Sequence, residues 1–344
     1  MFILPAESRL FAYYLFRLMT NPSRPSPPPL NTHASEVSHD QQQNSRLTRS
    51  WPWLLLLVLG VAWGGSFSLA KIAVDEGAHP LGVNYWQSLI GAAILISYLV
   101  LTRQSLPIGR NYLSFYLICG FLGSVVPGLL YFYAVIHVSP GVLAITIATV
   151  PIMTYIAAAL IKIERRSTFR MLGVCFGALS IILLIVPTES LPDRSAVPWV
   201  FAAIAAAACY TGENLVIAIR LPPGANAFVV LGGMLITATL IMTPFVLATD
   251  TFVPLSWPWG ASDWAIIGLA ILSVVCYGLF IGLVVRAGPV FASQTAYIVT
   301  LSGVFWGILI FGEKHSLWIW ASLASMLIAL ALVTPRKKGA AITD

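Results

Sequence analysis

Residues 53–74 read WLLLLVLGVAWGGSFSLAKIAV, an unbroken apolar run in which Lys71 is the single charged side chain. A helix needs about 20 mainly apolar residues to cross the hydrocarbon core of a bilayer. The run is continuously apolar, whereas the strands of a membrane barrel alternate between apolar and polar residues. This stretch therefore predicts a transmembrane helix.

The rest of the chain has the same character. Of its 344 residues, 58% are hydrophobic and only 9% are charged. A soluble domain needs more charge than this to cover its surface, so we expect lipid to be the main solvent. The formal charge of +6 comes from basic residues that lie between apolar segments, so we assign them to membrane orientation and predict no nucleic-acid partner.

Apolar segments of spanning length follow one another with short connections. We predict an all-α membrane protein with ten transmembrane helices, near Trp53–Val74, Leu81–Thr102, Tyr112–Ile136, Gly141–Ile161, Phe169–Val186, Val197–Ile219, Ala227–Ala248, Trp264–Val285, Pro289–Phe311 and Leu317–Val333. Pro127 and Pro151 fall in the middle of spans, where they predict a kink or a break.

The loops predict how the chain enters the membrane. Alternate loops and both ends hold most of the basic residues, including Arg103, Arg110, Arg166, Arg170 and Arg220, while the other loops hold Arg194 and Lys314. Cytoplasmic loops carry an excess of Lys and Arg. We therefore expect both termini in the cytoplasm, in a bacterial inner or plasma membrane.

The N-terminal stretch differs from the rest. Residues 21–30 read NPSRPSPPPL, and the following residues are polar up to Ser50. Such sequence cannot build a packed core, so we predict a disordered cytoplasmic tail over 1–50 and a second short tail over 335–344. Met1 and Met19 are both candidate starts of the chain.

The second half of the chain repeats the first. A shift of 149 residues aligns Pro140 with Pro289, Thr146 with Thr295, Glu164 with Glu313 and Ser167 with Ser316. A further echo at a shift of 147 pairs 63–66 with 210–213. Each copy holds five spans, so the two copies must enter the membrane in opposite directions. Inverted repeats are typical of secondary transporters.

At these residues the chain resembles the drug/metabolite transporter superfamily, in the group built from two EamA domains. The resemblance rests on the run from Trp63 to Phe67 with Lys71, the 140–151 segment, Glu164-Arg165 followed by Gly173, and Phe311-Gly312-Glu313. It implies a first repeat over 51–187, a second over 197–334, and two inverted five-helix halves. It also implies transport of small metabolites such as amino acids, with export more frequent than import. We expect no cofactor.

Three positions depart from the family pattern. Gln87 stands where the family often has an Arg, Lys162-Ile163-Glu164 replaces a small-Gly-Glu ending, and Thr300 replaces a Pro. These departures leave the family resemblance intact, but they prevent any transfer of substrate preference.

Glu213 is the sharpest candidate for the transport pathway. It lies inside the sixth span, next to Asn214 and one turn after Tyr210. An ionisable group within a span costs about 2.5–3.5 kcal/mol on insertion scales, so such groups usually face a polar cavity. Glu213 could bind a substrate amine or carry a proton. The alternative is a position at the inner rim, paired with Arg220.

Lys71 is the second charged residue within a span. Its long side chain could contact a substrate, but the sequence favours snorkelling to the interface or a structural ion pair. A single such Lys argues against a phosphorylated substrate.

Other polar and aromatic positions could line a cavity or simply pack between helices. The candidates for the pathway are Gln87, Gln294, Trp63 and Trp306, and similar polar positions are Asn84, Tyr131, Ser293 and Thr295. Pairs of Gly four residues apart, such as Gly60 and Gly64, predict close helix packing.

Glu164, Glu313, Pro140 and Pro289 mark equivalent places in the two repeats. We assign the two Pro to the openings of spans and the two Glu to their ends. A structural role is favoured for the carboxylates, which could accept bonds from the N–H groups that open the next helix.

Other function classes have little support. Every Asp lies in a loop or tail, and no HExxH, Walker A or Rossmann glycine motif is present, so we predict neither an enzyme nor a metal site. A receptor or scaffold would not need an inverted repeat. An uncoupled facilitator or channel on the same fold stays open and differs by lacking a buried titratable group linked to transport. We therefore expect a secondary carrier for a small molecule in the lipid bilayer, with protons as a possible coupling ion.

Overall fold

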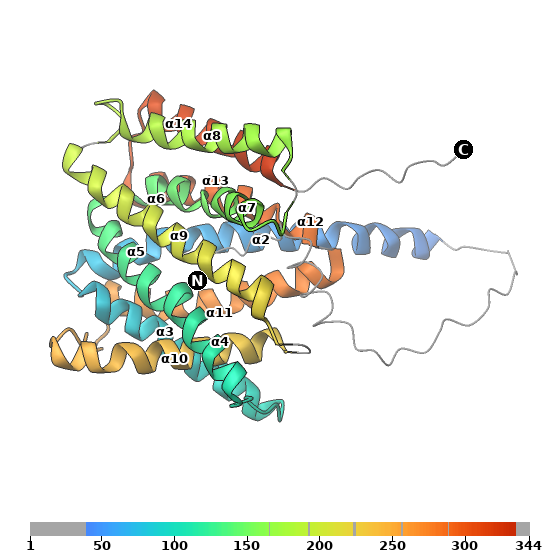
Figure 1. Ribbon diagram of the computed structural model, residues 1–344, viewed down its shortest axis with the longest axis vertical. Helices are drawn as coiled ribbons and strands as arrows, with labels where there is room; N and C mark the ends of the chain where they lie inside the picture. Colours follow the sequence, from blue (N-terminus) through green and yellow to red (C-terminus); the bar gives the residue numbers. More distant parts are fainter. Residues whose placement is uncertain are drawn as a thin grey trace, which may run out of the picture.

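The computed structural model describes residues 39–164, 166–191, 193–222, 225–255, 257–287 and 289–334, and these residues form helices and no strand (Figure 1). The helices are α2 His39–Asp75, α3 Pro80–Leu101, α4 Arg110–Gly120, η1 Phe121–Val125, α5 Val126–His137, α6 Pro140–Ile147, α7 Val150–Leu160, α8 Thr168–Ile185, η2 Arg194–Ala196, α9 Val197–Arg220, α10 Ala227–Ala248, α11 Ala261–Ala287, α12 Pro289–Ala292, α13 Thr295–Phe311 and α14 Leu317–Val333.

Eight helical segments among the described residues are long and apolar enough to cross a membrane. They are Trp51–Asp75, Pro80–Leu101, Arg110–His137, Pro140–Leu160, Thr168–Ile185, Arg194–Arg220, Ala227–Ala248 and Ala261–Val284. The apolar helices α13 and α14 are shorter, at 17 residues each. The chain is therefore an integral, multi-pass helical membrane protein.

The third span is interrupted where Pro127 predicts a break. Helix α4 passes into η1, a π-helical turn, in which the N–H of Val126 donates to the carbonyl of Phe121, five residues earlier. Pro127 cannot donate to the carbonyl four residues before it, that of Gly123, so the regular α-helical ladder fails at this point. The chain resumes as α5 on the far side of the Pro.

The fourth span is interrupted in a similar way between α6 and α7. Pro151 lies in the first turn of α7, where a missing N–H costs little. The Thr149 hydroxyl donates to the carbonyl of Thr146 at 2.7 Å and so satisfies the broken end of α6. The segment predicted as the ninth span also breaks, at Ser293 and Gln294 between α12 and α13, without a Pro at the break.

Small residues allow the helices to approach closely. Helix α2 packs on α13, where a Cβ on Gly64 would lie 2.0 Å from Ser302 Oγ, and Ser302 Oγ donates to the carbonyl of Gly60 at 2.9 Å. Helices α8 and α14 are joined by Ser180 and Ser322, each hydroxyl donating to the other residue's carbonyl at 2.8 Å. These contacts agree with the packing role predicted for the Gly60 and Gly64 pair.

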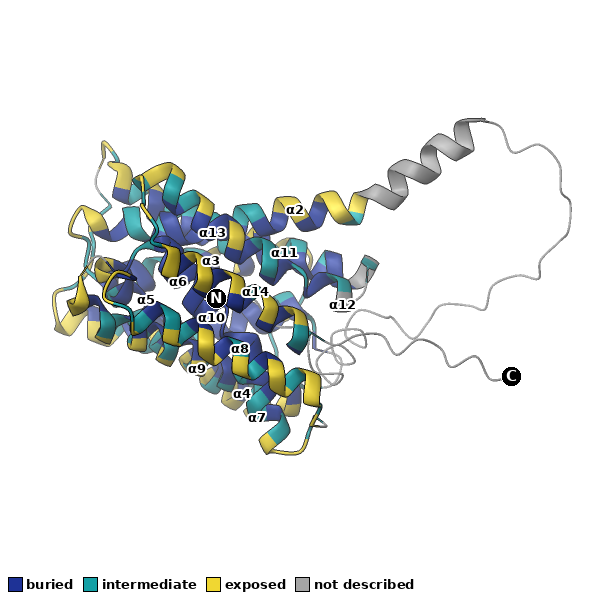
Figure 2. Ribbon diagram, turned by 90° about the horizontal axis from the view of Figure 1, so that it is seen from above, coloured by how far each residue is buried: buried dark blue, intermediate teal, exposed yellow. Residues whose placement is uncertain are grey.

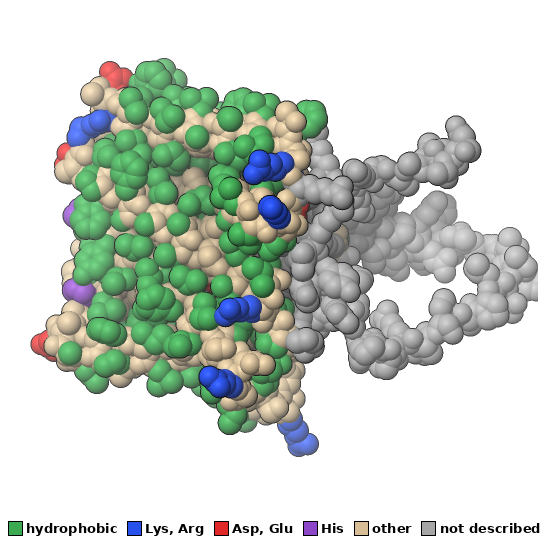
Figure 3. All heavy atoms as spheres, in the orientation of Figure 1, with side chains coloured by type: hydrophobic (Ala, Val, Ile, Leu, Met, Phe, Trp, Pro, Cys, Tyr) green, Lys and Arg blue, Asp and Glu red, His purple; other side chains and the backbone are tan. Residues whose placement is uncertain are grey.

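The surface of the bundle is largely apolar. In Figure 3 hydrophobic side chains cover the visible sides, with Lys and Arg gathered towards the end from which α2 enters and acidic and His side chains at the opposite end. Figure 2 shows that the buried residues lie where the helices face one another. This pattern suits a protein whose sides face lipid and whose ends face water.

The tails predicted at the two ends fall mainly outside the described residues, which begin at His39 and end at Thr334. Helix α2 begins at His39, so residues 39–50 of the predicted disordered tail are helical. Gln and Arg have high helix propensity, and an existing helix extends more easily than a new one forms.

Candidate functional site

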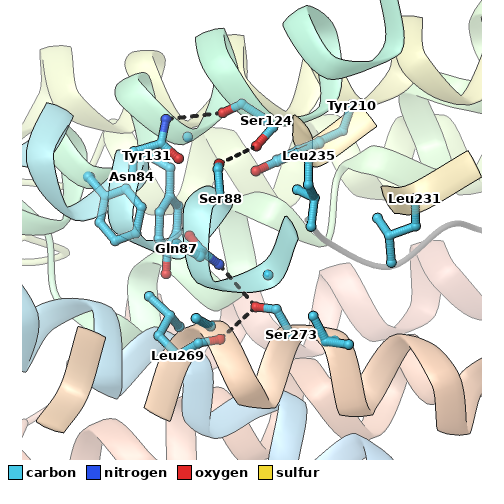
Figure 4. Close-up of a pocket in the computed structure, with 15 residues that line it drawn as sticks. Asn84, Gln87, Ser88, Ser124, Tyr131, Tyr210, Leu231, Leu235, Leu269 and Ser273 are labelled. Carbon is cyan, nitrogen blue, oxygen red and sulfur yellow. Dashed lines mark hydrogen bonds between the residues drawn. The ribbon is translucent and has the colours of Figure 1, made fainter. Parts of the chain in front are cut away.

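A small cavity lined by both polar and apolar side chains lies in the middle of the bundle, between α3, η1, α5, α9, α10 and α11 (Figure 4). Its volume of about 20 Å³ has room for a water molecule. None of the described residues that line it is charged. Its lining consists of Asn84, Gln87, Ser88, Gly91, Ser124, Gly128, Tyr131, Phe132, Tyr210, Leu231, Leu235, Leu269, Ala270, Ser273 and Val274.

Helix α3 supplies one polar face to this cavity. Asn84, Gln87 and Ser88 are spaced at i, i+3 and i+4, which places them on the same side of a helix. The Gln87 Nε2 donates to Ser273 Oγ at 3.0 Å, and Ser88 Oγ lies 3.1 Å from Ser124 Oγ. Figure 4 shows these bonds converging on the cavity from α3, η1 and α11.

Asn84 also compensates for the broken third span. Its Nδ2 donates to the carbonyls of Ser124 and Val125 in η1, at 3.1 and 3.2 Å. A buried carbonyl without a donor costs free energy, so an amide at this position stabilises the π-helical turn. The close approach requires Gly128, where a Cβ would lie 2.3 Å from Asn84 Oδ1.

Glu213 of α9 contacts the same turn. Glu213 is only 4% exposed. A Cβ on Gly123 would lie 2.2 to 2.4 Å from the atoms of its carboxylate. Tyr210, one turn earlier on α9, lines the cavity. Glu213 is therefore buried against the interrupted helix beside the cavity, and the alternative position at the inner rim is not what the structure adopts.

Asn214, next to Glu213 on α9, contacts a different helix. Its Nδ2 donates to Thr154 Oγ1 at 3.4 Å, and Thr211 Oγ1 lies 3.5 Å from the carbonyl of Val150. Both bonds connect α9 to the start of α7, next to the break in the fourth span. Asn214 is buried and is not among the residues lining the central cavity.

Lys71 lies at the end of α2, away from the central cavity. Its Nζ is 3.0 Å from Asp75 Oδ1 and donates to the carbonyl of Ile136 at 3.0 Å. This geometry matches the structural ion pair that the sequence favoured for Lys71.

The other predicted pathway residues pack between helices. Trp63 is buried with its ring edge-on to Phe280, at 6.1 Å between centroids. Trp306 Nε1 donates to the carbonyl of Val61 at 3.0 Å. Gln294 lies at the break between α12 and α13. Of the predicted pathway residues, Gln87 and Tyr210 line the central cavity, and Glu213 is buried next to Gly123 of η1. The other predicted residues do not line this cavity, namely Lys71, Trp63, Trp306, Gln294 and Asn214.

Three polar lining residues were missed by sequence reasoning, namely Ser88, Ser124 and Ser273. Asn84 and Tyr131 were recognised only as polar positions. The spacing of Asn84, Gln87 and Ser88 is a signal that could have found the α3 face. Ser273 carries no such signal, because its hydroxyl also donates to the carbonyl of Leu269 in its own helix, as buried Ser commonly does.

The repeat-related residues occupy helix ends. Pro140 and Pro289 begin α6 and α12. Glu313 Oε2 accepts a bond from the N–H of Gly141 at 3.3 Å, so it caps the start of α6. The next helix, α14, is capped by Ser316.

Glu164 differs from Glu313, because it accepts a bond from Arg170 Nη1 at 3.2 Å, in the first turn of α8. Among the described residues no group of three or more His, Cys, Asp or Glu could hold a metal ion.

The sequence of the chain is similar to known membrane transporters. A model of the EamA-like transporter family matches residues 50–186 and again 197–334. Over 283 residues the chain is 26% identical to YedA of Escherichia coli strain K12, described as an uncharacterized inner membrane transporter, covering 81% of this chain and 89% of YedA. YedA of E. coli O157:H7 matches to the same extent.

The fold also has a counterpart among solved structures. A crystal structure described only as that of a protein superposes with a TM-score of 0.57 at 18% identity. The match covers 83% of this chain and 96% of the other. At this identity the likeness concerns the fold alone.

Proposed function

The chain belongs to the EamA-like transporter family, and we propose that it is a secondary carrier that moves a small metabolite by alternating access. It is a membrane transporter and not an enzyme. The proposed substrate is an amino acid or a related compound, and the proposed direction is export.

The central cavity is the observation that carries this proposal. It combines an interrupted helix with neutral polar side chains that converge from three other helices, an arrangement that transporters use to bind solutes near the bilayer midplane. The lining offers hydrogen bonds and no basic group, which favours a neutral or zwitterionic solute over a phosphorylated one. The cavity has room for water but not for an amino acid, so passage requires the helices to move apart.

We further propose ten spanning helices in two inverted halves. Three observations support this. The family model matches twice, and the break between α12 and α13 explains why the ninth span is short. The helix contacts also occur in related sets: α2 packs on α11 and α13, and its counterpart α9 packs on α5, α6 and α7.

Glu213 supports coupling to protons. A carboxylate that is buried within a span beside the cavity can exchange a proton when the surrounding helices move, and such residues mark proton relays in membrane proteins. An uncoupled facilitator on the same fold is the main alternative, and it would need no titratable group at this place. A receptor or scaffold is a further alternative, which would show no solute flux.

The test is transport by purified protein in proteoliposomes. We would screen amino acids with and without an imposed pH gradient, comparing wild type with Glu213→Gln. Glu189→Gln is the matched control, because Glu189 is an exposed loop carboxylate. We expect wild type and Glu189→Gln to show gradient-driven flux and Glu213→Gln to lose the gradient dependence.

Each other outcome has a distinct meaning. Equal flux in all three proteins, independent of the gradient, would contradict proton coupling and support a facilitator. The absence of flux for every amino acid would contradict the proposed substrate class. If each variant elutes like the wild type and has the same helical content, misfolding is excluded as the cause of a change in flux.

A further inference from the structure

Helices α3 and α10 pack along each other beside the central cavity (Figure 1). Helix α2 enters the bundle at one end, and α3 begins soon after α2 stops, so α3 starts at the opposite end, which we call the distal end. Helix α10 ends at Ala248, and the residues that follow it contact the start of α3, so they also lie at the distal end. The first family match contains α3 and the second contains α10, so contacts between these helices join the two matched segments.

The residues that follow α10 form an extended segment over 249–255, which we call the strap. Asp250 has a positive φ of 52°, and the N–H of Thr251 donates to the carbonyl of Val246 at 3.1 Å, so the chain turns sharply where the helix ends. Beyond this turn alternate residues are part-buried, namely Thr251, Val253 and Leu255. The strap therefore lays one side on the bundle, as a strand of period two does.

The strap fits against two residues of α3 that lie one turn apart, Gly82 and Trp86. A Cβ on Gly82 would lie 2.4 Å from the carbonyl oxygen of Thr251 and 2.6 Å from Val253 Cγ2, so only Gly allows the strap to come this close. The Trp86 Nε1 donates to the carbonyl of Val253 at 2.7 Å, and its ring lies 5.4 Å from that of Phe252 between centroids. Steric fit and a hydrogen bond therefore hold the strap on α3.

This contact lies next to the part of α3 that lines the central cavity. Gln87, which follows Trp86, lines the cavity and donates to Ser273 Oγ of α11 at 3.0 Å. Asn84, between Gly82 and Trp86 in the sequence, lines the cavity as well. While the strap holds the start of α3 against the second matched segment, these lining residues cannot separate from α11 at the distal end.

The other end of α3 is held differently. There the ring of Tyr98 lies 5.0 Å from that of Phe228 at the start of α10, and a Cβ on Gly278 of α11 would lie 3.2 Å from Phe228 Cζ. The nearby hydroxyls of Ser97 and Thr102 donate to carbonyls of α3 itself. Apolar rings keep part of their contact when they slide, whereas a hydrogen bond is lost when its partners separate. The directional attachment of α3 is therefore at its distal end.

A separate contact at the distal end joins α2 to α11. Ser262 Oγ donates to the carbonyl of Ala73 at 2.7 Å, and the N–H of Ser262 donates to Glu76 Oε2 at 3.2 Å. None of the described residues of α2 lines the central cavity, so this contact can persist while α3 moves away from α11. The strap is thus attached on the side where the cavity has to open.

We propose that the strap is the distal lock of the transport path, and that it must leave Gly82 and Trp86 before the central cavity can open at this end. The inference rests on the proposed alternating access. It names the contact that has to break, whichever solute the cavity binds.

The experiment measures access to the cavity rather than transport. A reporter, Ser88→Cys, is placed in the cavity of a full-length parent whose four native cysteines are replaced by Ala. Its rate of reaction with a membrane-impermeant methanethiosulfonate is measured in spheroplasts and in inverted membrane vesicles. Glu189→Cys, in the exposed loop between α8 and α9, shows which preparation presents the distal end to the reagent.

Two variants weaken the lock in different ways. Trp86→Phe removes the N–H that bonds the carbonyl of Val253 but keeps an aromatic ring, and Gly82→Ala places a methyl group against the strap. We expect each variant to raise the reaction rate of the reporter from the distal side by about fivefold or more, because the loss of one hydrogen bond shifts a two-state equilibrium by about that factor. Trp86→Phe keeps the test informative if Gly82→Ala fails to fold.

Trp264→Phe and Gly268→Ala are the matched controls, both in the part of α11 near the distal end. Trp264 is 56% exposed, and a Cβ on Gly268 would meet Leu69 Cδ1 at an ordinary 3.9 Å. We expect both controls to react at the parent rate. Equal rates in the lock variants and the controls, or a parent reporter that already reacts as fast as Glu189→Cys from the distal side, would overturn the inference. The reagent needs no solute, so a failure to transport any amino acid would contradict the proposed substrate class and leave this result standing.

Discussion

At the scale of single residues, the contact between Glu213 and Gly123 leaves no space for an additional atom. A Cβ on Gly123 would lie 2.2 Å from the Glu213 carboxyl carbon, well inside contact distance. We expect Gly123→Ala to displace the carboxylate, to cost about 1–3 kcal/mol of stability through overpacking, and to lower transport in proteoliposomes.

Gly212→Ala is the matched control for this prediction. It lies next to Glu213 on α9, but a Cβ there would meet Leu122 Cδ1 at an ordinary 3.4 Å. We expect wild-type stability and transport for this variant. Equal transport by both alanine variants would show that the position of the Glu213 carboxylate does not matter for function.

Single residues also explain what the sequence could predict of the site. Glu213 and Tyr210 were predicted because an ionisable group in an apolar span is costly and therefore informative. Ser124 and Ser273 were not, because a Ser in a helix most often bonds its own backbone. Trp63 and Trp306 pack between helices and do not line the central cavity, because a large aromatic ring fills a helix interface as well as it lines a cavity.

At the scale of elements, two helices are followed by a residue in the left-handed conformation, but the type of that residue differs. Helix α13 ends at Gly312, with φ of 64°, while α7 is followed by Lys162, with φ of 63°. A residue with a side chain pays roughly 1–2 kcal/mol for this left-handed conformation, whereas Gly adopts it freely. We expect Lys162→Gly to raise the melting temperature in detergent and Gly312→Ala to lower it.

Arg103 is a second residue with a side chain in this left-handed conformation, because it follows α3 with φ of 54°. We therefore expect Arg103→Gly to raise the melting temperature as Lys162→Gly does. A thermal unfolding assay on purified protein measures all three variants. No change in Lys162→Gly and Arg103→Gly would mean that other contacts of these side chains offset the backbone strain.

Elements also set the limit of what could be predicted of the fold. The spans followed from apolar length, and the breaks near Pro127 and Pro151 followed from the missing N–H of proline. The break at Ser293 and Gln294 could not be predicted, because no Pro marks it. The π-helical form of η1 depends on contacts with Asn84 and Glu213 from other helices, which a local pattern does not contain.

At the scale of the whole molecule, the distribution of charge makes the orientation testable. Basic residues gather at the end of the bundle where α2 enters, so we propose cytoplasmic termini (Figure 3). A green fluorescent protein fused after Asp344 should fluoresce in E. coli, and alkaline phosphatase at the same site should be inactive. Alkaline phosphatase fused after Glu189 should be active, and the opposite pattern would show an inverted protein.

The reciprocal bonds between Ser180 and Ser322 have a consequence for how the molecule can move. Each hydroxyl donates to the other's carbonyl, so exchanging the two helices leaves the same pair of bonds. Under the proposed alternating access, this pair of bonds favours neither tilt of the two proposed halves over the other. Helices α8 and α14 can therefore keep these two bonds and stay together while the remaining helices rock around them. A covalent crosslink between positions 180 and 322 should leave transport unchanged, whereas a crosslink between positions 141 and 313 should abolish it.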